Sequence, residues 1–163
     1  MYGAMAKANV PVCFMHMRGD SKTMVLAENK EYPEDDVVIG VREELAVRVH
    51  NALQAGVRRW HILIDPGLGF AKHPHQSIQL LRSLSQVVAR GQDLEGFPTL
   101  VGPSRKGFIG AVINKTEADR VFGTAAACSA LIAEGVDVLR VHDVSEMSDV
   151  VKISDAIWRV YKK

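Results

Sequence analysis

The chain of 163 residues lacks the usual features of a membrane-bound or disulfide-stabilised protein. Its two cysteines, Cys13 and Cys128, are too few for a disulfide framework, so we expect buried free thiols in a reducing compartment. No apolar run reaches the ~18 residues needed to span a bilayer. Residues 1–9 lack the apolar core of a secretion signal. These absences predict a soluble cytoplasmic domain.

Charge clusters and common cofactor motifs are also missing. The formal net charge is +1 and like charges form no block, so we expect neither nucleic acid nor a membrane surface as a partner. Neither GxGxxG nor GxxxxGK[ST] occurs, which leaves the usual dinucleotide and nucleotide phosphate loops without support. The six histidines show no HExxH or Cys/His spacing, so no zinc site is indicated.

What the sequence does contain is a strand–loop–helix pattern repeated four times. Apolar or β-branched runs predict strands over residues 10–17, 59–65, 99–101 and 136–141. Residues 10–17 are apolar on both faces, as in parallel strands covered by helices. Apolar spacing, glycine stops and a possible cap at Asp20 or Ser21 predict helices over residues 22–29, 41–53, 78–88, 120–134 and 150–160. The alternation predicts an α/β fold with a parallel sheet and right-handed crossovers.

Polar side chains follow several of these strands at the same end. Ser104, Arg105 and Lys106 come after the third strand and a Gly-Pro break. Parallel α/β folds bind ligands at the carboxyl ends of their strands, so two cations there suggest an anionic or electron-rich ligand. The alternative is a solvated basic turn.

Asp65 ends the second strand and precedes a glycine-rich loop. A carboxylate there can accept hydrogen bonds from the N–H and NH2 edge of a heterocycle, or it can simply cap its own Asp-Pro-Gly turn. Arg140 and His142, two residues apart after the fourth strand, share a face and form a plausible phosphate or diphosphate clamp. Alternatively, Arg140 pairs with Asp137 or Asp143. Phe70 is either a stacking platform or a plug of the local core.

Four segments together carry a family resemblance. Residues 14–19, 65–72, 102–106 and 140–144 read FMHMRG, DPGLGFAK, GPSRK and RVHDV. Each lies at a strand end, and with them the chain closely resembles dihydropteroate synthase, the folate-pathway enzyme inhibited by sulfonamides. The resemblance implies a (β/α)8 barrel that joins 4-aminobenzoate to dihydropterin-CH2-diphosphate with release of diphosphate.

The resemblance also implies residue roles. Catalytic roles fall to Lys106, Arg140 and His142, of which Arg140 and His142 bind the departing diphosphate. The pterin is bound by Asp65, Lys106, Met15 and Arg140. The 4-aminobenzoate site includes Phe70, Ser104 and Lys106. No strong base is required, because the arylamine loses its proton after attack.

A complete barrel needs ~250 residues, and this sequence has four strands. We therefore expect residues 1–163 to be a partial pterin-binding domain, the C-terminal half of a (β/α)8 barrel without its N-terminal half. By resemblance, the missing half holds the asparagine that binds Mg²⁺, so no metal ligand is expected in this chain. The complete enzyme is expected to be a homodimer, either separate or fused to other folate-pathway domains, and mitochondrial if made from a longer eukaryotic precursor.

Other activities stay open. The isolated chain is either an inactive fragment, which we favour, or a half-barrel that works with a copy of itself or with another half. A pterin-binding module like the barrel methyltransferases is the alternative enzyme class. A structural half-barrel without catalysis is the third.

Overall fold

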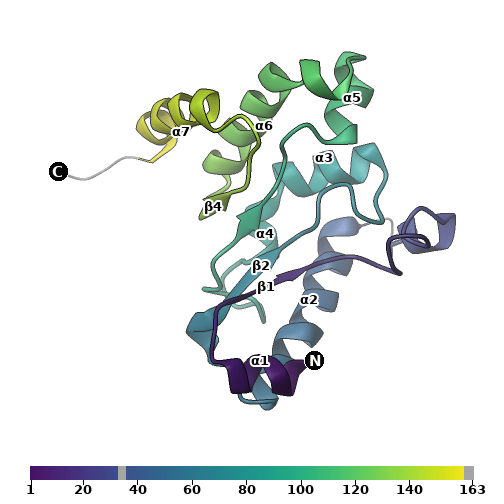
Figure 1. Ribbon diagram of the computed structural model, residues 1–163, viewed down its shortest axis with the longest axis vertical. Coiled ribbons are helices and arrows are strands. Elements are labelled where there is room, and N and C mark those ends of the chain that lie inside the picture. Colours follow the sequence, from purple (N-terminus) through teal and green to yellow (C-terminus); the bar gives the residue numbers. More distant parts are fainter. Residues whose placement is uncertain (33–35, 160–163) are drawn as a thin grey trace.

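Four short parallel strands form the centre of the structure. The structure, a computed structural model, describes residues 1–32 and 36–159. The strands are β1 (Val12–Met15), β2 (Ile62–Asp65), β3 (Leu100–Val101) and β4 (Val138–Leu139), and they lie side by side in chain order (Figure 1). All four predicted strands are present, but each is shorter than expected.

The pairing register brings the carboxyl ends of neighbouring strands level. Met15 of β1 lies opposite Asp65 of β2, and Val101 of β3 lies opposite Leu139 of β4. A single parallel bridge between Ile64 and Thr99 joins the two pairs of strands. Residues that follow the four strands therefore emerge along one edge.

Helices and short 3-10 turns connect the strands. They are α1 (Tyr2–Ala8), η1 (Ala27–Lys30), α2 (Val37–Gln54), η3 (Arg59–His61), α3 (Pro74–Arg82), α4 (Leu84–Val87), α5 (Gly107–Ile113), η4 (Glu117–Asp119), α6 (Val121–Ala133) and α7 (Val144–Trp158). Asp36 caps α2, because its carboxylate accepts the backbone N–H groups of Val38 and Ile39. Within the described residues, no helix is long and apolar enough to cross a bilayer.

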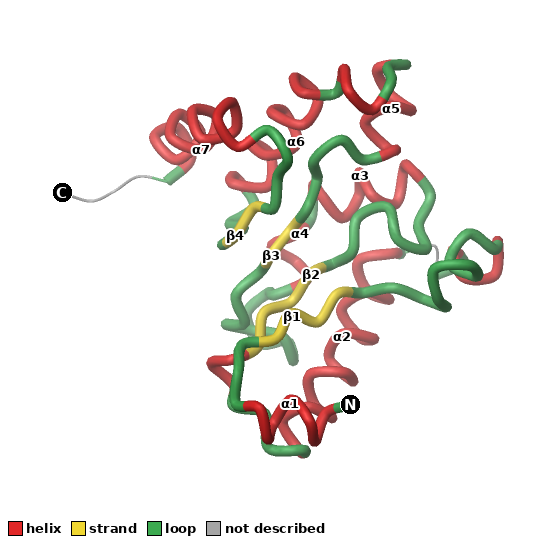
Figure 2. Tube along the Cα trace, viewed as in Figure 1, coloured by secondary structure: helices red, strands yellow, loops and turns green. Residues whose placement is uncertain are grey.

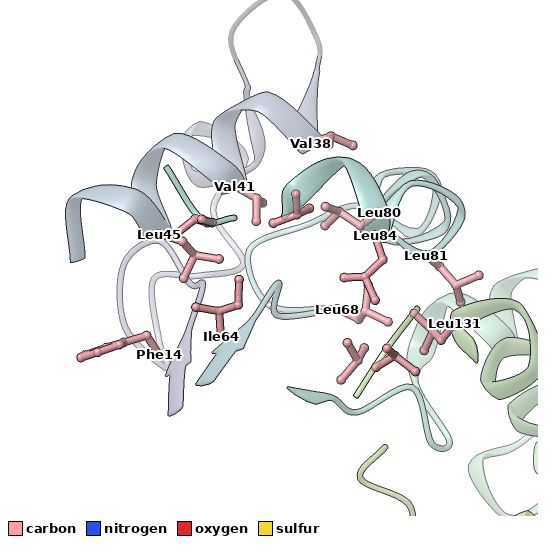
Figure 3. Packing of buried hydrophobic residues seen from close by; sticks show 14 of the residues in the cluster. Phe14, Val38, Val41, Leu45, Ile64, Leu68, Leu80, Leu81, Leu84 and Leu131 are labelled. Atoms are coloured by element: carbon pink, nitrogen blue, oxygen red, sulfur yellow. The ribbon is translucent and has the colours of Figure 1, made fainter. Parts of the chain in front are cut away.

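The hydrophobic core lies between the strands and these helices. Ile62 and Ile64 of β2 are fully buried, and so are Val41 and Leu45 of α2. Figure 3 shows Val41 and Leu45 beside Ile64, with Leu68, Leu80 and Leu84 continuing the same core. The four-residue spacing in α2 gives it one apolar side, which explains why it packs here.

The opposite face of β1 and β2 is open, so residues 10–17, whose two apolar faces suggested a strand covered by helices, are covered on one face only. Figure 2 shows α2, α3 and α4 behind these strands, and none of the described helices covers the front. Leu63 and Asp65 lie on this face and are only partly buried, whereas Cys13 is exposed. The prediction of a buried thiol is thus wrong for Cys13 and confirmed for Cys128.

Several predicted helices differ from those observed. Residues 22–26 form turns rather than a helix, because Asp20 accepts the N–H groups of Lys22 and Thr23 and the chain then turns into η1. The helix predicted over 78–88 is divided at Ser83 into α3 and α4. Helix α5 was not predicted. Val160, placed at the end of the last helix, lies outside the described residues.

Candidate functional site

Residues from the ends of all four strands line one cavity of about 310 Å³. Met15 and Asp65 are the last residues of β1 and β2, Lys106 follows β3, and Arg140 follows β4. The remaining lining residues are Leu68, Phe70, Leu100 and Gly102. The structure therefore brings Met15, Asp65, Phe70, Lys106 and Arg140 together, whereas Ser104 and His142 are not among the lining residues.

Asp65 both caps its own turn and lines the cavity, the two roles considered for it from the sequence. Its Oδ1 accepts the N–H of Gly67 at 2.7 Å, as a turn cap does. The same carboxylate borders the cavity, where it is available to a ligand. Burial raises the pKa of Asp65, while the Gly67 hydrogen bond and the charges of Lys106 and Lys72 act in the opposite direction.

The ammonium group of Lys106 packs against the ring of Phe70, and both residues line the cavity. Its Nζ is 4.0 Å from the centroid of Phe70, a cation–π distance. Burial lowers the pKa of Lys106 and the Arg140 charge adds to this, whereas Asp65 raises it. Phe70 is half-buried and acts as a platform, but in this structure the group on it is the Lys106 ammonium.

Arg140, which lines the cavity, forms a short polar row with His142 and Ser104. The Nη1 of Arg140 is 3.5 Å from the Nε2 of His142. The Oγ of Ser104 accepts the backbone N–H of His142 at 3.2 Å and lies 3.0 Å from its Nδ1. Ser104 is buried, whereas Arg140 and His142 are exposed. The buried hydroxyl of Ser104 thus fixes the position of the His142 imidazole.

Arg105 does not join the site, which corrects the expectation of two cations at this strand end. Its guanidinium pairs with Asp143, with Nε 3.1 Å from Oδ2, and its φ of 58° places the residue in the left-handed region. Asp137, the other carboxylate considered for Arg140, instead accepts the N–H and hydroxyl of Thr99. Neither ion pair considered for Arg140 forms.

Sequence reasoning missed a buried polar network behind the cavity. His16 is fully buried and Lys72 is 6% exposed, and the Nζ of Lys72 lies 2.9 Å from the Nδ1 of His16. The Nε2 of His16 is 3.1 Å from Glu44, which also accepts the Nε of Arg18 at 2.8 Å. Both His16 and Lys72 belong to the quoted segments, but nothing in their spacing signals burial.

Neither a larger cavity nor a group of metal-ligating side chains in the described residues indicates a different site. A larger cavity of about 470 Å³ between α2 and residues 93–97 contains none of the predicted site residues. Within residues 1–32 and 36–159, no three His, Cys, Asp or Glu side chains are grouped as metal ligands. The charged side chains of the cavity are one carboxylate, Asp65, and two cations, Lys106 and Arg140, and this set does not fit a Mg²⁺ ion.

Comparison with protein families identifies the fold. A family described as "Pterin binding enzyme" matches residues 1–142. The chain belongs to this family.

Curated relatives of this chain agree with the family assignment. It is 41% identical over 160 residues to "Folic acid synthesis protein fol1" of Pneumocystis carinii, covering 98% of this chain and 21% of the relative. It is also 41% identical over 155 residues to "Dihydropteroate synthase" of Synechocystis sp., covering 94% of this chain and 50% of the relative. The chain thus spans half the length of that synthase and about a fifth of the fungal protein.

A solved structure matches the fold closely. The dihydropteroate synthase of Thermus thermophilus in complex with 4-aminobenzoate superposes with a TM-score of 0.84 at 36% identity. The match covers 97% of this chain and 61% of the other chain. The arrangement of parallel strands and helices is therefore that of a dihydropteroate synthase.

Proposed function

We propose that this chain supplies part of the active site of a dihydropteroate synthase. The reaction joins 4-aminobenzoate to dihydropterin-CH2-diphosphate and yields dihydropteroate and diphosphate. The observation that carries the proposal is the convergence of Asp65, Lys106 and Arg140, from three successive strand ends, on one cavity with Met15 and Phe70. The identity to named synthases supports it.

The pterin fits the chemistry of the cavity. An Asp65 carboxylate accepts hydrogen bonds from the amino and ring N–H groups of a pterin, which a neutral acceptor would bind less strongly. Met15, across the β1–β2 pair from Asp65, offers a polarisable side chain to the ring. Lys106 and Arg140 contribute donors for the remaining acceptor edge. These four residues form the proposed pterin site.

Arg140 and His142 suit the departing diphosphate. In the reaction, the amine nitrogen of 4-aminobenzoate attacks the exocyclic CH2 carbon, and the C–O bond to diphosphate breaks with its electron pair on oxygen. Positive donors at that oxygen stabilise the charge as it develops. The nitrogen then releases a proton to water. Lys106, Arg140 and His142 are the proposed catalytic residues.

The 4-aminobenzoate site is proposed at Phe70, Ser104 and Lys106. Phe70 offers a ring face, and Lys106 lies above it, where its ammonium can meet the carboxylate of the substrate. Ser104 contributes from behind, because its buried hydroxyl holds His142. The site is open on the side of the uncovered strand face.

We further propose that the four βα units are the C-terminal half of a (β/α)8 barrel and that residues 1–163 are a partial domain. The open face of β1 and β2 and the match to half of the Synechocystis enzyme support this proposal. A Mg²⁺ ion, a homodimer and fusion to other folate enzymes are proposed for the complete protein only, with metal ligands outside this chain. We place that protein in the cytoplasm, or in the mitochondrion if it is made from a longer eukaryotic precursor.

A fusion experiment tests the function. The N-terminal half of the Synechocystis synthase is joined ahead of residues 1–163, and dihydropteroate formation is measured with both substrates, for the fusion and for the chain alone. We expect turnover by the fusion and none by the chain alone. A fusion that is folded by circular dichroism and binds dihydropterin-CH2-diphosphate without turnover would favour a non-synthase pterin module. Turnover by the chain alone would contradict the half-barrel proposal.

A further inference from the structure

Lys72 is a buried lysine that the proposed reaction does not use. It ends the loop of residues 66–72, which begins after Asp65, and its side chain is directed inward. Its Nζ donates to the backbone carbonyl of Phe70 at 3.0 Å and to the Nδ1 of His16 at 2.9 Å. It therefore joins the loop that carries Phe70 to the residue that follows Met15 at the end of β1.

His16 extends this connection to Asp65. Its backbone N–H donates to the carbonyl of Asp65 at 2.8 Å. Because Lys72 donates to Nδ1, the imidazole proton lies on Nε2 and points to the Glu44 carboxylate, 3.1 Å away. Burial lowers the pKa of His16 to about 4, in agreement with a neutral ring. His16 thus contacts the end of β2 through its backbone and the loop through its buried side chain.

The loop itself is packed tightly against β1. A Cβ built on Gly67 would lie 2.0 Å from the carbonyl oxygen of His16. Ala71 has a φ of 49°, a conformation that is unfavourable for alanine, and its carbonyl accepts the hydroxyl of Tyr32 at 3.1 Å. Backbone in this conformation persists only where surrounding contacts hold it, and Lys72 supplies two of them.

We propose that Lys72 is a positioning residue for the pterin pocket, holding the loop of Asp65 and Phe70 against the end of β1 without touching the ligand. This inference rests on the proposed function. It predicts that loss of the Lys72 amine lets Phe70 and the Asp65 carboxylate move relative to Met15. Both substrates then bind more weakly, whereas the step at the diphosphate is affected less.

Two carboxylates and two guanidinium groups influence the protonation of Lys72. The carboxylates of Asp65 and Glu44 favour its protonated form, the guanidinium groups of Arg18 and Arg48 disfavour it, and the facing His16 ring is neutral. Burial lowers the pKa of Lys72 to about 7. Protonated Lys72 stabilises the Asp65 carboxylate, so pterin affinity is expected to fall as pH rises through 7.

Three variants test the role in the fusion protein described above. Lys72→Met keeps the length of the side chain without its donor, Lys72→Arg keeps a charged donor, and Lys7→Met removes an exposed lysine on α1. For Lys72→Met we expect KM for dihydropterin-CH2-diphosphate to rise about tenfold with kcat within about threefold, and the pH dependence near 7 to disappear. Lys72→Arg should recover part of the affinity, and Lys7→Met should match the parent protein.

A second measurement needs no ligand and separates this inference from the proposed function. Amide hydrogen exchange of residues 67–71 is compared between the 163-residue chain and its Lys72→Met and Lys72→Gln variants. We expect about tenfold faster exchange in this loop with little change in α2. Unchanged exchange, or a fall in kcat without a rise in KM, would overturn the positioning role. Failure of the unsubstituted fusion to bind pterin would instead contradict the proposed function.

Discussion

Arg140 has the clearest residue-level role in the proposed reaction. It is exposed at the end of β4, next to His142, and it forms no ion pair with Asp137 or Asp143. Its guanidinium is therefore available to an anion. Its planar donors match two oxygens of a diphosphate, which a lysine ammonium would not do.

Replacing Arg140 tests this role. In the fusion protein, Arg140→Ala is expected to lower kcat about 100-fold, because one donor to the developing charge of the leaving group is lost. Steady-state kinetics with both substrates measure the change. The control is Arg58→Ala, since Arg58 is exposed before β2 and stacks on Trp60, away from the cavity. Equal losses in the two variants would contradict the assignment.

His16 makes stability depend on pH in a predictable direction. Burial lowers its pKa to about 4, against 6.5 for an ordinary histidine, so between these values the unfolded chain binds a proton that the folded chain does not. The free energy of unfolding therefore has its full value above pH 6.5 and decreases as the pH falls toward 4. The loss is expected to be about 3 kcal/mol.

The measurement is urea unfolding of the 163-residue chain at several pH values. His16→Gln should be less stable at pH 7 but should show a shallower dependence between pH 6.5 and 4. Glu44 adds to the loss at lower pH. Its burial opposes ionisation, but hydrogen bonds from His16 and Arg18 lower its pKa to about 2. An unchanged slope in the His16 variant would mean that another group causes the acid sensitivity.

At the level of elements, the loop after β2 depends on glycine at position 67. Gly67 has a φ of 68° and lies directly on the His16 carbonyl, whereas Gly91 has a φ of 78° and open space around it. Gly67→Ala and Gly91→Ala therefore share the cost of a left-handed alanine, about 1 kcal/mol, and differ in the steric clash. We expect Gly67→Ala to lose at least about 2 kcal/mol more. Urea unfolding gives both values, and equal losses would contradict the clash.

An element could be predicted from the sequence where a pattern within one short segment determines it, and could not be predicted where it does not. Helix α2 followed from a four-residue apolar spacing within one segment. The turns at residues 22–26 could not be distinguished from a helix, because a side chain that caps a helix can equally close a turn. Helix α5 has seven residues, too few for a periodic pattern to stand out from its glycines.

The same distinction between local patterns and distant partners applies to the residues of the candidate site. The placement of Asp65, Lys106 and Arg140 followed from strand order alone. The pairing of Arg105 with Asp143 could not be predicted, since the two residues are 38 positions apart in sequence. Burial of Lys72 likewise depends on His16, 56 residues away. Strand ends are predictable from local pattern, whereas side-chain partners across the sheet are not.

For the whole molecule, the main feature is that helices cover only one side of strands β1 and β2. The covered side holds the core, and the open side holds the proposed site residues. In a (β/α)8 barrel that open side would become the interior. The proposed catalytic groups and the unpaired strand edges thus occur together. If the chain is half of a barrel, as proposed, completing the fold and completing the pocket would be a single event.

The exposed thiol of Cys13 gives this event a chemical reporter. Of the two cysteines in the chain, Cys13 lies on the open strand face and Cys128 is buried. A maleimide dye should therefore label the 163-residue chain once, at Cys13, and slowly, because burial raises the pKa of this thiol to about 11 and the thiolate is the reacting form. In the fusion with the Synechocystis half, with that half's own cysteines replaced, labelling should slow at least about tenfold, because a closed barrel excludes the reagent. A labelling rate that does not change would mean that the two halves do not close.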